Sequence, residues 1–234
     1  MEQWNDPTFA YEWAEQNIDN TDRARIIGLL IKIMKDYLGA ASVPPRILDI
    51  GCGHGIIAAH ILDELPGVTL VGVDGSPPML AMARERLSPF RSRATLIHAD
   101  FETMSSADLT GGPFGIVFAS QAIHNCSDEG KLKTLASCRA VMVQNGLFIL
   151  YDRIKLVTPA LFSVYRSIWD TTGAEFGGQQ NEGDSFVEHE ATRVGRGDRP
   201  GSLEQNVLWL REAGFREVAV VQVVGIRALI VALV

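Results

Sequence analysis

The sequence lacks clustered positive charge. Its 234 residues include 21 Lys and Arg against 28 Asp and Glu, a formal net charge of −7, and they contain no block of basic residues. Proteins that bind nucleic-acid phosphates or an anionic membrane surface need such clusters. The composition therefore argues against a nucleic-acid partner and against membrane association.

Cysteine is scarce, and the features of a secretion signal are absent. The three cysteines, Cys52, Cys126 and Cys138, show no Cys-x-x-Cys spacing, and an odd number cannot all pair within one chain. We interpret them as free thiols in a reducing compartment. Residues 1–7 have neither the basic nor the apolar region of a signal peptide. We therefore expect a soluble, cytoplasmic protein.

A hydrophobic run long enough to cross a membrane is also missing. The apolar stretch at residues 218–234 is 17 residues long and is interrupted by Gln222, Gly225 and Arg227. A membrane-spanning helix needs about 20 apolar residues. We predict two buried strands here instead, joined at Gly225 in a tight antiparallel hairpin.

A glycine-rich turn is the most informative feature that the chain does contain. Residues 46–50 are typical of a buried strand, and a helix is expected to begin near His54. Gly51, Gly53 and Gly55 let the backbone turn sharply and let a ligand approach without a Cβ in the way. The free N–H groups at the start of the helix would face that ligand. Strand, glycine turn and helix in this order indicate a nucleotide-binding site.

Short apolar strands alternate with amphipathic helices through most of the chain. This alternation predicts an α/β fold with a doubly wound, mostly parallel sheet, which the antiparallel C-terminal hairpin completes. Strands are expected at 46–50, 69–74, 94–99, 115–119, 147–151, 216–224 and 227–234, and helices at 54–65, 77–87, 128–143 and 202–213.

Two segments are expected to cover this core. Residues 1–45 combine several aromatic side chains with a helix at 21–38, and we interpret them as an N-terminal helical lid. Residues 46–234 form the nucleotide-binding domain, with an insertion at 157–201 that caps the substrate. A helix opens this insertion, and residues 171–201 are expected to form a long irregular loop, a feature that is often functional.

Acidic residues narrow the choice of nucleotide. Asp74 follows the third glycine by 19 residues and ends a strand, where a carboxylate can accept hydrogen bonds from both ribose hydroxyls. NAD(P) sites normally carry Gly-x-Gly-x-x-Gly, but Ile56 stands at the position of the last glycine. Asp49, two residues before the first glycine, suits a ligand with an ammonium group. Asp100 and Phe101 offer a carboxylate and a ring face to an adenine.

Together these motifs resemble those of the class I S-adenosylmethionine-dependent methyltransferases. The matching segments are 48–55, 71–74, 98–101 and 114–121, and the resemblance covers about residues 45–152. It implies a Rossmann-like, seven-stranded sheet that binds S-adenosyl-L-methionine and releases S-adenosyl-L-homocysteine. The residues that it assigns to the cofactor site are Asp49, Gly51, Cys52, Gly53, Asp74, Gly75, Ser76, Met79, Asp100, Phe101, Ser120 and Gln121.

Departures from the family's motifs favour its small-molecule branch. The segment 114–121 lacks the Asn/Asp-Pro-Pro-Tyr signature of many members that methylate nucleic-acid and protein amides. No lysine follows as in the catechol type, and no acidic cluster indicates a metal. Asp152, at the end of a strand, is interpreted as a helix cap or a salt-bridge partner.

His124 is the best-placed candidate for a general base. It follows the strand at 115–119, whose carboxyl end should face the ligand crevice, and its ring titrates near neutrality. A structural histidine that holds the loop is the alternative. His189 could reach the substrate if the expected loop closes. Candidate substrate contacts are Tyr11, Asn125, Tyr165 and Trp169.

We therefore expect a methyltransferase that acts by in-line displacement on an O, N or C atom of a small-molecule acceptor. Two alternatives stay open. The chain could bind S-adenosylmethionine for another reaction or for regulation, or it could be an NAD(P)-dependent oxidoreductase, which Ile56 and the terminal hairpin disfavour. A monomer and a homodimer are both compatible with the sequence.

Overall fold

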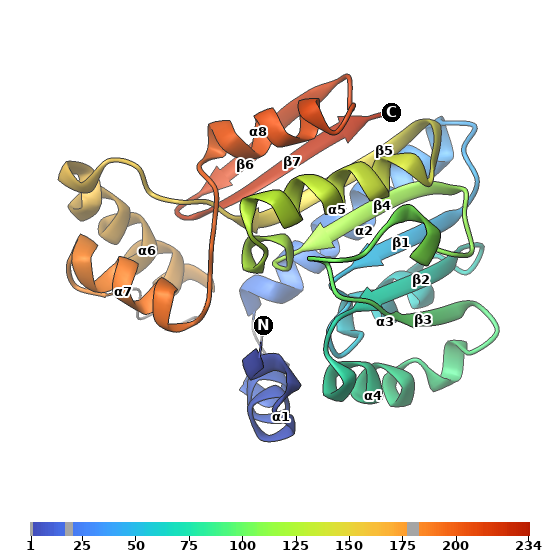
Figure 1. Ribbon diagram of the computed structural model, residues 1–234, viewed down its shortest axis with the longest axis horizontal. Coiled ribbons are helices and arrows are strands. Elements are labelled where there is room, and N and C mark those ends of the chain that lie inside the picture. The colour runs from blue at the N-terminus through green and yellow to red at the C-terminus, as the bar shows by residue number, and fades with distance from the viewer. Residues whose placement is uncertain (1, 17–20, 177–182) are drawn as a thin grey trace.

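The fold is built on a seven-stranded sheet. The computed structural model describes residues 2–16, 21–176 and 183–234. The strands lie in the order β3-β2-β1-β4-β5-β7-β6 (Figure 1). Their bounds are β1 Arg46–Ile50, β2 Thr69–Asp74, β3 Ala94–His98, β4 Phe114–Ser120, β5 Met142–Arg153, β6 Val218–Val224 and β7 Arg227–Leu233.

The predicted mixture of parallel and antiparallel strands is confirmed. β1 pairs in parallel with β2 and β4, β2 with β3, and β4 with β5. β7 runs antiparallel to both β5 and β6, and Gly225 has φ 56° in the tight turn between β6 and β7. The strand order reverses between β1 and β4. In open α/β sheets, ligands bind at such a point, outside the carboxyl ends of the strands.

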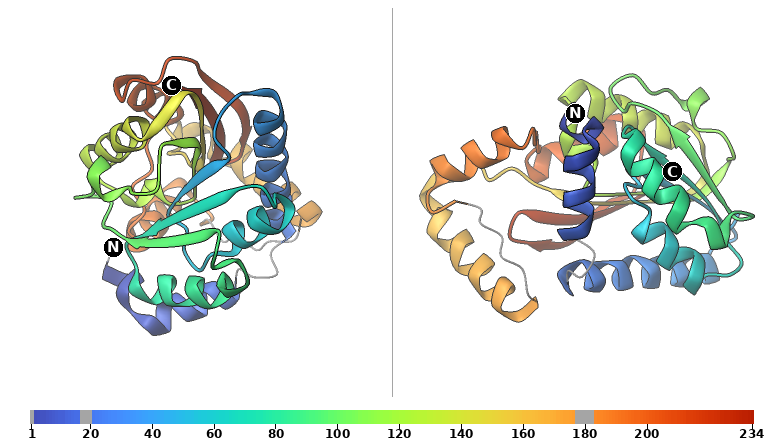
Figure 2. Two further views of the ribbon diagram at one scale, coloured as in Figure 1. Left: turned by 90° about the vertical axis from the view of Figure 1, so that its right-hand side faces the viewer. Right: turned by 90° about the horizontal axis from the view of Figure 1, so that it is seen from below.

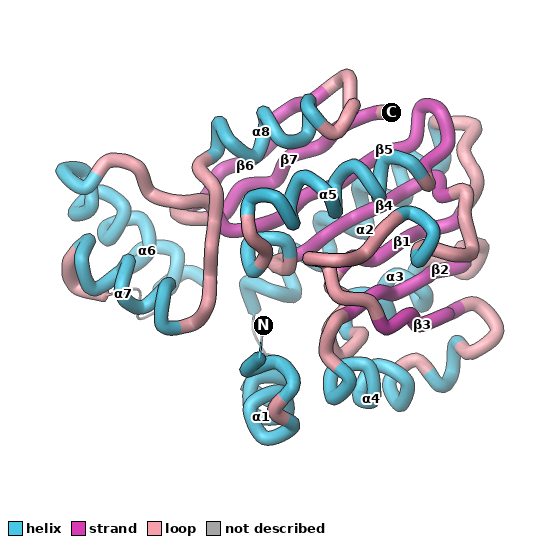
Figure 3. The backbone as a smooth tube through the Cα atoms, in the orientation of Figure 1, coloured by secondary structure: helices cyan, strands magenta, loops and turns pink. Residues whose placement is uncertain are grey.

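Helices cover both faces of the sheet. Figures 1 and 3 show α5 and α8 on one face and α2 and α3 on the other. β5 is buried on both sides, because Phe148 and Leu150 join the core under α5 and α8, whereas Ile149 and Tyr151 join the core under α2 and α3. The helices are α1 Pro7–Gln16, α2 Thr21–Ala40, α3 Ile56–Glu64, α4 Pro77–Arg86, α5 Asp128–Ala140, α6 Phe162–Phe176, α7 Phe186–Gly195 and α8 Leu203–Glu212.

Serine side chains fix where several of these helices begin. Ser76 Oγ accepts a hydrogen bond from Met79 N–H at 3.2 Å at the start of α4. Ser127 and Ser202 cap α5 and α8 in the same way, with donor–acceptor distances of 3.0 and 3.1 Å. Each cap satisfies a backbone donor that the first turn of a helix leaves free. Within the described ranges, no helix is long and apolar enough to cross a membrane.

The prediction of an irregular loop at 171–201 is wrong over much of that range. α6 continues to Phe176, residues 177–182 lie outside the described part of the chain, and α7 follows. Ser185 caps α7 by accepting a hydrogen bond from Glu188 N–H at 3.2 Å.

The apolar residues of α7 do not mark its inward face, which explains the error. Val187 and Val194 are exposed, whereas His189 and Arg193 are buried. A search for apolar residues at helical spacing therefore finds no buried stripe in this segment. His189 packs against the rings of Phe162 and Trp169 on α6, and Arg193 pairs with Asp198 just beyond α7.

Helices α6 and α7, which we call the cap, project from the sheet beside the turn between β6 and β7 (Figure 1). Phe162 and Trp169 pack edge to face with ring centroids 5.6 Å apart, and Leu156 and Ile226 complete this small core. A Cβ at Gly225 would lie 2.6 Å from Trp169 Nε1, so the hairpin turn fits closely against the cap. Seen from below, α1 lies between the cap and α4 (Figure 2).

Candidate functional site

The glycine turn lies at the carboxyl end of β1, beside β2 and β4. Gly51 N–H and Cys52 N–H both donate to Val73 O, at 2.8 and 3.0 Å. Gly51 has φ 78°, and a Cβ at this position would lie 2.1 Å from Ala122 Cβ, in the loop after β4. Gly55 also has φ 78° and is the N-cap of α3. Glycine is therefore required both by the backbone conformation and by close packing.

Asp74 holds this turn from the end of β2. Its Oδ2 accepts a hydrogen bond from Gly53 N–H at 2.8 Å, and its Oδ1 accepts one from Ser76 N–H at 2.9 Å. Burial raises the pKa of Asp74, and the backbone donors partly offset that rise. Each carboxylate oxygen has a second lone pair, so Asp74 can accept two further hydrogen bonds from a ligand while it keeps both backbone contacts.

Asp49 is a buried carboxylate without a full set of partners. Its side chain is 1% exposed, and its Oδ2 has no hydrogen-bond partner among the described residues. Burial and the neighbouring Asp74 raise the pKa of Asp49 well above its usual value. An unsatisfied buried acceptor costs about 1–3 kcal/mol, so a cationic donor at this position would be stabilising.

Of the residues assigned to the adenosine end, Ser76 contacts the N-terminal segment. Ser76 Oγ donates to Trp4 O at 2.5 Å, and this contact ties residues 2–5 to the start of α4. Met79 is buried on α4, Asp100 is exposed, and Phe101 is buried with Cε2 3.8 Å from a Cβ built on Gly51. Gly75 O lies 3.2 Å from His98 Nε2.

The side chain of Cys52 is buried against β2. Its Sγ lies 3.0 Å from a Cβ built on Gly72 and 3.9 Å from Gly53 O. At the end of β4, Ser120 and Gln121 are half-buried, and Gln121 has φ 52°. A non-glycine residue in this region of φ is strained, and such strain is concentrated at functional sites.

Both ring nitrogens of His124 face carboxylates. His124 lies in the short helical turn Ile123–Asn125 and is buried. Its Nδ1 is 2.5 Å from Asp152 Oδ1, and Asp152 Oδ2 accepts a hydrogen bond from His124 N–H at 2.9 Å. Its Nε2 is 3.5 Å from Asp198 Oδ1. Asp198 lies just beyond α7, so the cap delivers the second carboxylate.

Two arginines hold Asp198 in place. Arg193 Nη1 is 2.9 Å from Asp198 Oδ2, and Arg153 Nε is 3.8 Å from the same oxygen. Burial raises the pKa of Asp198, but His124 and the two guanidinium groups outweigh it, so the net pKa lies below its usual value. Asp198 is therefore an anion beside His124 Nε2.

These carboxylates change the titration of His124. Burial alone would lower the pKa of His124, but Asp152 and Asp198 outweigh burial and raise it. A raised folded-state pKa contributes stability below the unfolded value of about 6.5, and this contribution is lost as the pH rises through the folded-state pKa.

Asp152→Asn is expected to lower the pKa of His124, because it removes the nearer anion. Titration of the His124 ring by NMR measures the shift directly, and the stability lost on raising the pH above 6.5 should shrink in the variant. Asp63→Asn, an exposed substitution on α3, serves as the control. An unchanged His124 pKa in Asp152→Asn would contradict the conclusion that Asp152 raises the pKa of His124.

The candidate substrate residues are scattered. Asn125 lies next to His124, and its Nδ2 donates to Ala122 O at 3.2 Å. Tyr11 is 50% exposed on α1. Tyr165 and Trp169 pack in the core of the cap, where the His189 ring lies 5.3 Å from Trp169 and 5.9 Å from Phe162. Of these candidates, only Asn125 adjoins the pair formed by His124 and Asp152 in the described part of the chain.

The sequence reasoning missed Asp198 and Arg193. Both fall in the segment interpreted as an irregular loop, and their link to His124 bridges more than 60 residues of chain. For Asp152, the predicted role as a salt-bridge partner is confirmed, because its Oδ1 lies 2.5 Å from His124 Nδ1, but the sequence did not identify that partner. A carboxylate and a histidine that follow adjacent parallel strands should meet at the same sheet edge.

Comparison with known proteins adds to this geometry. Residues 47–146 match a family described as a methyltransferase domain. Malonyl-[acyl-carrier protein] O-methyltransferase of Legionella pneumophila is 32% identical over 126 residues, which cover 54% of this chain and 41% of the relative. Demethylmenaquinone methyltransferase of Thermus thermophilus is 29% identical over 115 residues, which cover 49% of this chain and 50% of the relative.

Solved structures share the fold. The protein PigF, solved with SAH, superposes on the whole chain with a TM-score of 0.65 at 19% identity, and the match covers 61% of PigF. The chain spans half or less of the two curated relatives named above.

Proposed function

We propose that this chain is a class I S-adenosylmethionine-dependent methyltransferase that transfers a methyl group from S-adenosylmethionine to a hydroxyl oxygen of a small organic molecule. The observation that carries the proposal is the glycine turn at the switch point of the sheet, with the buried Asp49 and Asp74 beside it. The reducing setting of a cytoplasm agrees with three free cysteines, all of them buried.

The residues around the turn fit this cofactor. The orphaned Oδ2 of Asp49 suits an ammonium group, which is present on the amino-acid part of S-adenosylmethionine. Asp74 keeps two lone pairs for the ribose hydroxyls. Gly51 and Gly53 present backbone without side chains to the methionine part, while Gly75, Ser76, Met79, Asp100 and Phe101 lie toward the adenosine part.

His124 is placed to serve as the base. When bound, S-adenosylmethionine supplies an electrophilic methyl group on a good leaving group, so alignment accounts for much of the rate. A hydroxyl acceptor must also lose its proton as it attacks, and an imidazole is a suitable base. Asp152 holds Nδ1 and thereby orients the ring so that Nε2 receives the proton.

Asp198 stands where that acceptor would bind. Its 3.5 Å contact with Nε2 is at the limit of a hydrogen bond, and together with Asp152 this anion raises the pKa of His124. In this proposal, the acceptor hydroxyl replaces Asp198 at Nε2. The lower pKa that follows from losing this anion makes His124 a base when the acceptor is present.

An oxygen acceptor is favoured over nitrogen or carbon for two reasons. A base beside the reacting atom is most useful for a hydroxyl, which is a poor nucleophile before it loses its proton. The names of the Legionella relative and of a structural neighbour, mitomycin 7-O-methyltransferase, state oxygen as the methylated atom, whereas that of another neighbour, CurJ, states carbon, so the base is the stronger reason.

Calorimetry with S-adenosylhomocysteine tests the cofactor assignment, and we expect saturable binding with one site per chain. A fluorescence titration with NADH should show no binding. Acceptor preference is then tested with labelled S-adenosylmethionine and matched phenols, carboxylic acids and amines. Absence of S-adenosylhomocysteine binding at millimolar concentration contradicts the proposal, whereas binding without transfer to any acceptor favours a regulatory protein.

A further inference from the structure

The amino-acid part of S-adenosylmethionine carries two charges, and the site described above accounts for one of them. Asp49 offers its unpartnered Oδ2 to the ammonium group. The carboxylate needs a cation or backbone donors, and charge-assisted hydrogen bonds from arginine are the strongest available in proteins. The residues next to the glycine turn in sequence, 46–60, contain no arginine after Arg46.

Helix α2 supplies an arginine from outside the matched domain. Arg23 Nη1 lies 3.5 Å from Nε2 of His54, the residue that follows Gly53 in the turn. The Arg23 guanidinium also lies over the Trp13 ring, 4.9 Å from its centroid, and Trp13 lies 6.1 Å from the His54 ring. The first turn of α2, helix α1 and the glycine turn therefore meet at the guanidinium of Arg23.

The ring of His54 separates Arg23 from a second cation. Arg86 Nη1, from α4, contacts His54 Nδ1 and also donates to His54 O at 3.0 Å. Burial, then Arg86 and Arg23, lower the pKa of His54 to about 4, so the ring is neutral at physiological pH. His54 thus spaces two guanidinium groups along the turn and adds no charge of its own.

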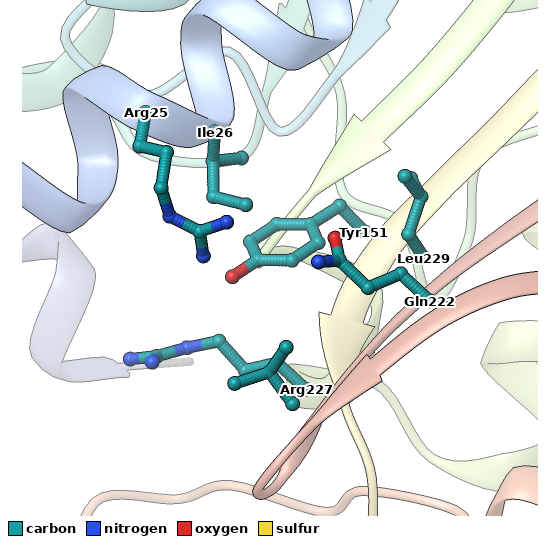
Figure 4. Close-up of a pocket in the computed structure, with 7 residues that line it drawn as sticks. Arg25, Ile26, Tyr151, Gln222, Arg227 and Leu229 are labelled. Carbon is teal, nitrogen blue, oxygen red and sulfur yellow. The ribbon is translucent and has the colours of Figure 1, made fainter. Parts of the chain in front are cut away.

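A further arginine, Arg227, lies close enough to Arg23 to affect its titration. Burial and the like charge of Arg227 lower the pKa of Arg23 to about 10, and Tyr151 only partly offsets them. Arg227 and Arg25 line one hollow with Tyr151, and Figure 4 shows both guanidinium groups on the hydroxyl side of that ring.

We propose that Arg23 binds the carboxylate of the cofactor's amino-acid part, and that Asp49 binds its ammonium group. This inference rests on the proposed function, because it needs S-adenosylmethionine as the ligand. It assigns a cofactor contact to the N-terminal helices, which the methyltransferase-domain match at 47–146 does not include. Arg23 would also bind a carboxylate on the methyl acceptor. Cofactor analogues with and without the amino-acid part distinguish these two ligands.

Calorimetry on Arg23→Gln with two ligands tests the assignment. S-Adenosylhomocysteine carries both charges, whereas 5′-methylthioadenosine keeps the adenosine and lacks the amino acid. Loss of a charge-assisted contact should weaken S-adenosylhomocysteine binding by about 10- to 100-fold. Binding of 5′-methylthioadenosine should stay within about twofold of wild type, because Arg23 does not contact the adenosine.

A second ligand and a control variant complete the design. Decarboxylated S-adenosylmethionine keeps the ammonium group, so Asp49→Asn should weaken its binding and Arg23→Gln should not. Arg25→Gln removes the same charge from the same helix and should leave S-adenosylhomocysteine binding within about twofold of wild type.

Three outcomes would overturn the proposal. One is an equal loss for both ligands in Arg23→Gln, which would mean that Arg23 supports the fold of the site. Another is an equal effect of Arg25→Gln, which would mean that the positive charge of α2 acts at a distance and that Arg23 makes no specific contact. The third is unchanged S-adenosylhomocysteine binding in Arg23→Gln, which would leave the acceptor carboxylate as the alternative. Wild-type binding of S-adenosylhomocysteine in the same series keeps these failures distinct from failure of the proposed function.

Discussion

Asp74→Ala is expected to weaken S-adenosylhomocysteine binding by ~2–4 kcal/mol, the value of two charge-assisted hydrogen bonds from ribose hydroxyls. Both oxygens of Asp74 already accept backbone hydrogen bonds, from Gly53 and Ser76. The substitution therefore also frees two donors that hold the turn, and this loss adds to the effect on binding. Isothermal calorimetry gives the change directly.

Asp63→Ala is the matched control for this variant. Asp63 lies exposed on α3, and its loss changes the net charge equally without touching the turn. Thermal unfolding of both variants separates a folding defect from lost ligand contacts. Wild-type affinity in Asp74→Ala would refute the ribose assignment. Lowering the pH should also weaken binding in the wild type, because the raised pKa of the buried Asp74 brings its protonation closer to neutrality.

His124→Gln is expected to lower kcat/KM for a hydroxyl acceptor by about 10²- to 10⁴-fold, the usual contribution of a general base. Glutamine has no titratable nitrogen, but its amide N–H can still donate to Asp152, so the buried carboxylate keeps a partner. S-Adenosylhomocysteine affinity should not change. Steady-state rates with an acceptor from the panel, together with calorimetry, check both statements.

The pH profile gives an independent test of His124. The rate in the wild type should rise with pH through the pKa of His124 in the acceptor complex, and this limb should disappear in His124→Gln. His60→Gln, an exposed histidine substitution on α3, should retain the wild-type profile. If His124→Gln keeps both the rate and the rising limb, His124 is a structural residue of the loop.

Local sequence signals predicted the sheet and the glycine turn well. β1 and β2 begin and end at the predicted residues. Each is a short apolar run that begins soon after a turn residue, Pro45 or Gly67, and ends just before a glycine. The N-cap at Ser76 follows from side-chain chemistry within four residues. The motif also predicted that Asp74 would lie beside the glycine turn, and Asp74 does accept a hydrogen bond from Gly53 N–H in that turn.

Contacts that join distant segments were not predictable in this way. Asp198 meets His124 only after the cap folds against the end of β5, and no spacing rule connects positions 124 and 198. Arg23 reaches the turn because α2 packs across the sheet, although its sequence pattern shows only an amphipathic helix. For α7, the buried side chains are charged or polar, so the usual hydrophobic signal was absent.

The segment that follows the cap is tied to His124, the proposed base, by backbone as well as by charge. Arg199 N–H donates to His124 O at 2.7 Å, next to the Asp198 contact with the ring. A cap exchanged between related enzymes would therefore not behave as an interchangeable module. A graft that alters residues 198–199 would reset the protonation of His124 together with the shape of the acceptor site. Acceptor choice and pH optimum should consequently change together when this part of the chain diverges.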